Sequence, residues 1–237
     1  MLIRHKATFN KGIVLALTFV GVLILIFSPV FGGGRSGLEY SDDLFNKLSK
    51  GSSYFIPKVV ESNKKFDGQS LDVTVKLAKA DEVDKAVKMV IASGGQVGAK
   101  DTEVKVNMDL GKLLATVVKD SDAMYRNDGK EVSGRYGLDE RDVMTVWWNL
   151  LNPMVKDLQK QKKIEEANAV SETLKKAVEP AFNFYGIEAQ SVADKAFTMI
   201  FLLVFYVAYT MWWGYAIYFL FDGIGLSMKK AKVKKEV

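Results

Sequence analysis

Two long segments with almost no charged side chains constrain this chain more than any other feature of its 237 residues. The first, at residues 12–31, covers about 20 residues, and a helix of that length spans the roughly 30 Å hydrocarbon core of a bilayer. The second runs from Ala196 to Met228 and contains one residue that is charged at neutral pH, Asp222. We therefore predict two transmembrane helices, residues 12–31 and 196–226, with an aqueous region between them.

The first segment also has some features of a secretory signal peptide. Arg4, Lys6 and Lys11 form a basic region ahead of the apolar residues, and the nearest candidate cleavage site lies around Phe31. A cleavage site needs small residues, whereas Phe31 is bulky. The sequence therefore favours an uncleaved membrane anchor.

The second segment is longer than one upright span requires. Its helix either projects above the membrane as a stalk or ends near residues 222–225. Aromatic residues crowd its centre and lower half instead of forming two separate belts. This distribution predicts that some rings pack against another protein helix, the alternative being ordinary lipid-facing aromatics. In this helix we expect partner contacts at Tyr206, Tyr209, Trp212, Trp213, Gly214 and Asp222.

Lysine and arginine collect at the two ends of the chain. The tail 1–11 carries three of them without an acid, and the tail 227–237 carries five lysines with one glutamate. By the positive-inside rule both termini are cytoplasmic and the middle of the chain is periplasmic, in a multi-pass protein of the cell inner membrane. The net charge of +5 then reflects topology and contact with anionic lipid headgroups, and gives no argument for nucleic-acid binding. Asp222 lies near the same interface. Its carboxylate is either hydrated there, or it contacts a partner or forms part of an ion path.

Between the two segments we predict a glycine-rich linker at residues 32–40 and an α/β domain at residues 41–137. Ser41 is the expected N-cap of a first helix that extends to about Lys50. Apolar residues then alternate at 71–77 and again at 104–110, which is the period of half-buried strands. Helical periodicity follows each of them, up to two glycines at 94–95 and up to about residue 124. The order is β-α-β-α, with helices on one face of the sheet and a weak third strand near 130–136.

From residue 138 to 195 the pattern predicts a long helical arm. One apolar face continues across Pro153, where the helix should break or kink, and a more polar helix from 160 to 178 is closed by Pro180. A further helix from Glu188 can run into the second membrane segment. The fold class is therefore an α+β membrane protein in which two transmembrane helices flank an extracytoplasmic domain.

Trp147 and Trp148 lie on the apolar helix of the arm. Neighbouring residues point about 100° apart on a helix, so only one ring can comfortably face the core. Trp148 is the candidate for an exposed anchor that contacts a partner, and a wide groove that buries both rings is the alternative.

The residue types present exclude several kinds of chemistry. The chain has no cysteine and one histidine, His5 in the N-terminal tail, which excludes thiolate metal sites, iron–sulfur clusters and catalytic triads built on histidine in the central domain. The acidic residues around Asp120 and Asp128 do not fit a calcium loop, because Met124 and Tyr125 stand where an oxygen ligand and a glycine are required. We predict no cofactor, no metal and no catalytic residue.

These observations favour a non-catalytic accessory or scaffold subunit whose partners are other membrane-protein subunits of a larger membrane or envelope complex. The alternative is a ligand-sensing module that signals through the second membrane helix to a separate partner. Two spans around an extracytoplasmic domain resemble the input half of a bacterial chemoreceptor, although only about nine residues follow Met228, with no signalling domain. A pore or transporter subunit is a third possibility, which needs oligomers and a polar lining beyond Asp222.

Overall fold

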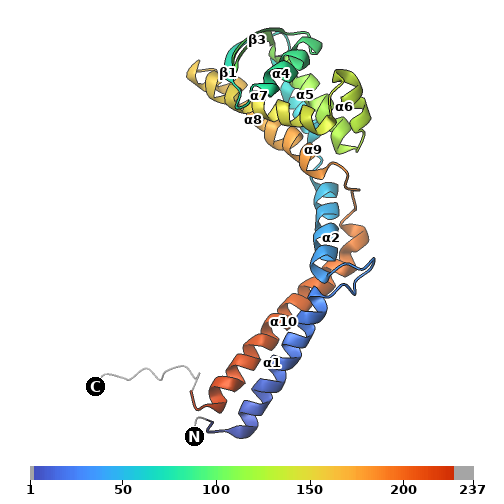
Figure 1. Cartoon of the computed structure of the whole chain (residues 1–237), viewed down its shortest axis with the longest axis vertical. Helices are drawn as coiled ribbons and strands as arrows, with labels where there is room; N and C mark the ends of the chain where they lie inside the picture. The colour runs from blue at the N-terminus through green and yellow to red at the C-terminus, as the bar shows by residue number, and fades with distance from the viewer. Residues whose placement is uncertain (1–2, 227–237) are drawn as a thin grey trace, which may run out of the picture. The chain divides into compact units, whose positions relative to one another are not determined.

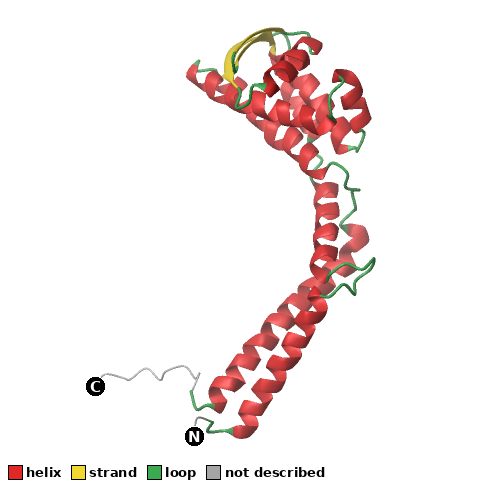
Figure 2. Ribbon diagram, viewed as in Figure 1, coloured by secondary structure: helices red, strands yellow, loops and turns green. Residues whose placement is uncertain are grey.

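The computed structural model describes residues 3–226, so the basic C-terminal tail lies outside the described residues. The described residues are helix-rich, with 71% of them in helices and one small three-stranded sheet among them (Figure 2). It divides into two compact units. Unit 1 contains residues up to Phe45 and from Gln190 onward, and unit 2 contains Asn46–Ala189.

Unit 1 consists mainly of two apolar helices, α1 (Lys6–Phe27) and α10 (Ala196–Gly223), which lie side by side in Figure 1. Both helices are long and apolar enough to cross a membrane by length and composition, as the sequence predicts. They run antiparallel, because the end of α10 lies beside the start of α1. The backbone N–H groups of Arg4 and His5, directly before α1, donate to the carbonyl oxygen of Gly223 at the end of α10.

The second apolar helix, α10, begins at Ala196 as predicted and ends at Gly223, close to the predicted end. The prediction that a helix from Glu188 runs into it is wrong. Residues 188–192 are not helical, and a short 3₁₀ turn at Ala193–Lys195 precedes α10. The Ser191 hydroxyl accepts the backbone N–H of Ala193 at 3.2 Å, so this serine begins a new turn instead of continuing an older helix.

The first helix after α1 also differs from prediction. Helix α2 (Gly37–Ser52) starts four residues before the expected N-cap Ser41. Ser36 and Glu39 form the reciprocal capping pair: the Glu39 backbone N–H donates to the Ser36 hydroxyl at 3.2 Å, and the Ser36 N–H donates to the Glu39 carboxylate at 2.7 Å. The end of the predicted linker is therefore helical.

Unit 2 surrounds a single hydrophobic core. Its elements after α2 are α3 (Ile56–Asn63), β1 (Ser70–Lys76), α4 (Asp81–Ala92), β2 (Gln96–Lys100), β3 (Glu103–Asp109), α5 (Leu110–Tyr125), α6 (Gly129–Tyr136), α7 (Glu140–Lys160), α8 (Ile164–Thr173), a π-helical turn (Leu174–Val178) and α9 (Glu179–Phe184).

The sheet has the strand order β1-β3-β2, and both pairings are antiparallel. In β1 and β3 every second residue is buried, with Val73 opposite Val106, so the predicted one-sided sheet is confirmed. The sequence analysis missed β2, because its residues are almost all exposed and show no apolar alternation. β2 and β3 are joined by a tight turn in which Asp101 has a φ of 54°.

Two other predictions about local structure are wrong. The segment expected as a third strand is helix α6, because the Asp128 side chain caps its start and Gly137, with a φ of 60°, ends it in the left-handed conformation. Pro180 does not close a helix: it lies at the start of α9, which continues directly from the π-helical turn Leu174–Val178.

Helix α7 continues through Pro153 without a break. A proline inside a helix costs about 3 kcal/mol, and here residues on both sides of it are buried in the core, so packing offsets that cost. Its buried residues belong to the same cluster as those of the strands. The expected helical arm and the α/β domain thus form one body.

Candidate partner-binding surfaces

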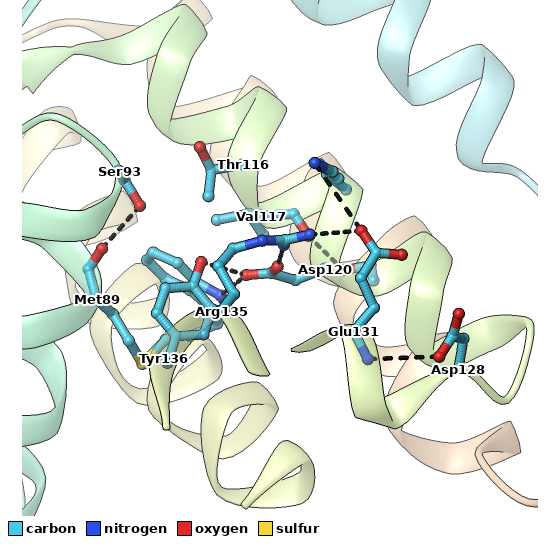
Figure 3. A network of polar contacts seen from close by, with 12 residues as sticks. Met89, Ser93, Thr116, Val117, Asp120, Asp128, Glu131, Arg135 and Tyr136 are labelled. Atoms are coloured by element: carbon cyan, nitrogen blue, oxygen red, sulfur yellow. Dashed lines mark hydrogen bonds and ion pairs between the residues drawn. The ribbon is translucent and has the colours of Figure 1, made fainter. Parts of the chain in front are cut away.

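A buried carboxylate at Asp120 organises the helical side of unit 2. Its Oδ2 accepts hydrogen bonds from Tyr136 Oη at 2.6 Å and from Trp147 Nε1 at 2.8 Å. Its Oδ1 forms an ion pair with Arg135, which also pairs with Glu131 at 2.7 Å (Figure 3). Burial raises the pKa of the Tyr136 phenol above its ordinary value. Since a buried charge must be paired and hydrogen-bonded, these contacts fix how α5, α6 and α7 pack.

The two adjacent tryptophans of α7 point to different sides of the helix, as predicted. Trp147 is fully buried and meets Tyr136 edge-on at a centroid distance of 6.4 Å, whereas Trp148 is 37% exposed. The hydrogen bond from Trp147 to Asp120 fixes the rotation of α7 about its own axis. It therefore also holds the next residue, Trp148, at the surface.

Trp148 lines a groove between α7 and α9, which we call the Trp148 groove. Its volume is about 310 Å³. The buried side chains of Met144 and Val178 form its floor, and the ring of Phe182, 37% exposed, is its second aromatic side chain. The remaining lining residues are Thr145, Glu179 and Asn183. The sequence analysis missed Phe182 and Glu179, because only folding brings α9 beside α7.

The π-helical turn Leu174–Val178 leads directly into the groove. Such turns contain one extra residue, are rare, and occur frequently at functional sites. Leu174, Ala177 and Val178 are buried, while the next residue, Glu179, is exposed. The turn therefore joins a buried segment to the exposed residues Glu179, Phe182 and Asn183 on one face of α9.

In unit 1 the aromatic residues of α10 pack against a helix, and that helix is α1 of the same chain. Tyr209 stacks on Phe19 with ring centroids 4.1 Å apart and donates a hydrogen bond to the Phe19 carbonyl oxygen at 3.0 Å. Trp212 Nε1 donates to the Leu15 carbonyl oxygen at 3.1 Å. Gly12 is buried at a close approach of the two helices: a Cβ atom on it would lie 2.7 Å from the Leu220 nitrogen. Tyr209 and Trp212, which were expected to contact a partner protein, thus contact α1 of the same chain.

The other expected contacts on α10 lie differently. Trp213 contacts Phe19 at a centroid distance of 4.7 Å but stays 40% exposed. Tyr206 is 67% exposed, and Gly214 is exposed with no atom within 4 Å of a Cβ placed on it. Tyr206 and Gly214 therefore remain accessible after α1 and α10 have paired.

Asp222 occupies the last turn of α10 and is half-buried. Its backbone carbonyl accepts the N–H of Gly225, which has a φ of 85° and ends the helix. No ion pair of its carboxylate occurs within residues 3–226. The lysines that could pair with it in the sequence analysis lie outside the described residues.

Lys50 is a second buried charge, and the sequence analysis gave no sign of it. Its Nζ donates to the Asn127 Oδ1 at 2.9 Å and to the carbonyl oxygens of Phe184 at 3.1 Å and Ile187 at 2.6 Å. It also lies 5.2 Å from the centre of the Tyr125 ring. Desolvation lowers the pKa of the Lys50 ammonium. Lys50 thus ties the start of unit 2 to its last residues.

The acidic residues near Asp120 do not form a loop, because Asp120 and Asp122 both lie on α5. Asp122 accepts a hydrogen bond from Tyr54 at 2.7 Å and pairs with Arg126 at 2.8 Å. Within residues 3–226, no group of three histidine, aspartate or glutamate side chains is placed to hold a metal ion. Comparisons with protein-family models, with curated proteins and with solved structures find no match to this chain.

Proposed function

We propose that this protein is a non-catalytic accessory subunit of a larger complex in the cell inner membrane. In this proposal α1 and α10 cross the bilayer as an antiparallel pair, and unit 2 stands on the periplasmic side, where it docks to another subunit. The observation that carries the proposal is the apolar surface that pairing leaves uncovered. Phe197, Leu203 and Tyr206 remain 83%, 64% and 67% exposed. Soluble monomers rarely expose a continuous apolar surface of this kind, whereas lipid or neighbouring helices cover it.

The charges at the helix ends support the orientation. Arg4, Lys6 and Lys11 lie at the start of α1, beside the end of α10 at Gly223. Basic residues next to a span are retained in the cytoplasm, and they are attracted to anionic lipid headgroups. The start of α1 and the end of α10 therefore both belong on the cytoplasmic side in this proposal.

Cysteine labelling in intact cells tests this topology, and the absence of native cysteines gives a clean background. Lys100→Cys places a thiol on exposed β2 in unit 2, and His5→Cys places one beside the start of α1. A membrane-impermeant maleimide should label the first variant in intact cells and the second only after lysis. Labelling of His5→Cys but not Lys100→Cys in intact cells would reverse the orientation.

Co-purification tests the docking role. Trp148→Ala removes an exposed ring of the groove, and the matched control Ile91→Ala removes a side chain on α4 that is 58% exposed. In mild detergent, the wild type and the control should retain stoichiometric partner subunits, and Trp148→Ala should lose them. A wild-type protein that purifies as a stable monomer would contradict the proposal.

The groove also favours a second candidate, the ligand-sensing module. Its volume of about 310 Å³ falls at the lower end of the range for small-molecule sites, roughly 300–1,000 Å³. A sensor predicts that a small molecule raises the melting temperature of the full chain, whereas a scaffold predicts a partner protein as the stabilising agent.

A further inference from the structure

We propose that the Trp148 groove binds an ammonium group carried on an aliphatic chain, the chemistry of a lysine side chain. The inference rests on the proposed function, because it takes the lysine from the docking subunit. It follows from three properties of the groove: two exposed aromatic rings, a carboxylate without an ion pair, and an apolar floor.

The aromatic rings provide the first attraction. Trp148 and Phe182 line the same groove from different helices, and each is 37% exposed. The face of an aromatic ring carries negative electrostatic potential and attracts a cation within about 6 Å of its centre, most strongly when the ring is tryptophan. Two such rings around one groove favour a positively charged guest over a neutral one.

The groove also carries a negative charge, that of Glu179. Glu179 is exposed, and no ion pair of its carboxylate occurs within residues 3–226. Asn183, on the same face of α9 four residues later, adds a side-chain carbonyl oxygen that can accept an N–H. An ammonium group can satisfy both residues at once, since it combines one charge with three donors.

The chain itself shows that a cation is stable beside this ring. The guanidinium carbon of Arg141 lies 5.8 Å from the centre of Phe182 and 5.2 Å from the centre of Tyr185. Arg141 is not one of the residues that line the groove, so its side chain does not fill the groove itself.

The apolar floor of the groove favours a charged group that is attached to an alkyl chain. Met144 and Val178 are buried apolar side chains, with exposures of 0% and 1%. A lysine side chain has a stem of four methylene groups that gains by lying on such a surface while its head stays among polar atoms. The groove therefore suits an ammonium on an alkyl stem better than a strongly hydrated inorganic cation.

The test compares two small probes that differ in one group, with the full chain in mild detergent. N-acetyl-lysine methylamide carries the ammonium, and N-acetyl-norleucine methylamide has a similar alkyl chain without it. Ligand-observed NMR should show that the lysine probe binds about 10-fold more tightly, as expected for a cation between aromatic rings and a carboxylate. Equal affinities for the two probes would overturn the inference.

Matched variants assign the binding to this groove. Glu179→Gln should weaken the lysine probe about 5-fold and leave the norleucine probe unchanged, since it removes charge but not shape. Glu188→Gln, which neutralises an exposed glutamate outside the groove, should change neither affinity. Preference for lysine that survives Glu179→Gln and Trp148→Leu together would place the site elsewhere and reject the assignment.

A third probe separates a lysine side chain from a free organic cation. Choline should bind more weakly than the lysine probe, and the opposite order would reject the assignment to lysine. The experiments also distinguish a failure of the ammonium site from a failure of the docking proposal. Release of the partner subunits by Trp148→Ala, together with equal affinities for the lysine and norleucine probes, would support the docking proposal and reject the ammonium site.

Discussion

At the residue scale, unit 2 contains two largely buried charges, and the two are balanced differently. Asp120 is balanced by another charge, Arg135, and by two hydrogen bonds. Lys50 is balanced by three neutral oxygens and an aromatic ring. Removing one member of a buried charged cluster leaves the others unsatisfied, so both residues should be sensitive to substitution.

Asp120→Asn should lower the free energy of unfolding by about 3 kcal/mol, at the lower end for a broken buried pair, because Glu131 still pairs with Arg135. Thermal or urea unfolding of the full chain in detergent measures the change. Asp122→Asn on the same helix is the control. Its pairs with Tyr54 and Arg126 lie nearer the surface, so it should cost less than about 1 kcal/mol. Equal losses of unfolding free energy in the two variants would mean that the Asp120 network contributes no more to stability than the contacts of Asp122.

Tyr136→Phe should give a pH-dependent loss. The phenol is buried, and its pKa in the folded protein is raised above the ordinary value of 10.0. The stabilisation from the neutral hydroxyl is therefore complete below about pH 10 and is lost as the pH rises through the folded-state pKa. The wild type should be more stable than Tyr136→Phe by about 1 kcal/mol at pH 8, and this difference should shrink above pH 10. A constant difference from pH 8 to pH 11 would contradict the assignment.

Lys50→Met should destabilise unit 2 by about 2 kcal/mol, because it keeps the stem but leaves the Asn127, Phe184 and Ile187 oxygens without their donor. Lys58→Met, at an exposed position on α3, is the control and should change stability by less than about 0.5 kcal/mol. Proteolysis after residue 184 should also become faster in Lys50→Met alone. Unchanged melting and unchanged proteolysis would show that the three contacts contribute nothing.

Sequence reasoning worked at this scale where neighbours in the chain decide the outcome. The different environments of Trp147 and Trp148 follow from helical geometry alone. The environments of Lys50 and Asp120 do not, because their partners lie up to 137 residues away in the chain. For the same reason Glu179 gave no signal until folding placed it beside Trp148.

At the element scale, the close approach of α1 and α10 depends on small residues at the contact. Gly12→Val should separate the helices, because even a Cβ atom would lie 2.7 Å from the Leu220 nitrogen. We expect a loss of about 1–3 kcal/mol, measured as a lower melting temperature in detergent. Gly21→Val on the same helix is the matched control, since a Cβ atom there meets nothing within 4 Å. Similar effects of both substitutions would argue against tight packing at Gly12.

The elements with a regular apolar pattern could be predicted, and those set by side-chain caps or exposed edges could not. Strands β1 and β3 follow from alternation, and the apolar helices follow from composition. Strand β2 has no buried face to reveal it, α2 is moved by the Ser36–Glu39 capping pair, and α6 depends on caps at Asp128 and Gly137. The break predicted at Pro153 is absent, because tertiary packing outweighs the tendency of proline to interrupt a helix.

At the scale of the whole molecule, the sequence separates the chain into two apolar segments and a region of mixed composition, and the structure places the two apolar helices in one unit and the sheet in the other. The sequence could not show that the helical residues 138–184 share a core with the strands, because apolar helices of an arm and of a compact domain have the same periodicity. It also could not show that the aromatic face of α10 finds its first partner within the chain.

The pairing of α1 with α10 has a consequence for biosynthesis. Tyr209 and Phe19 are 190 residues apart, so α1 leaves the ribosome long before the helix that covers its inner face exists. In the interval, Gly12 and the backbone at Leu15 and Phe19 are without the helix that contacts them in the finished protein. Under the proposed membrane topology, insertion of the nascent chain therefore proceeds in two stages, and a chain interrupted before Ala196 presents α1 without its partner helix.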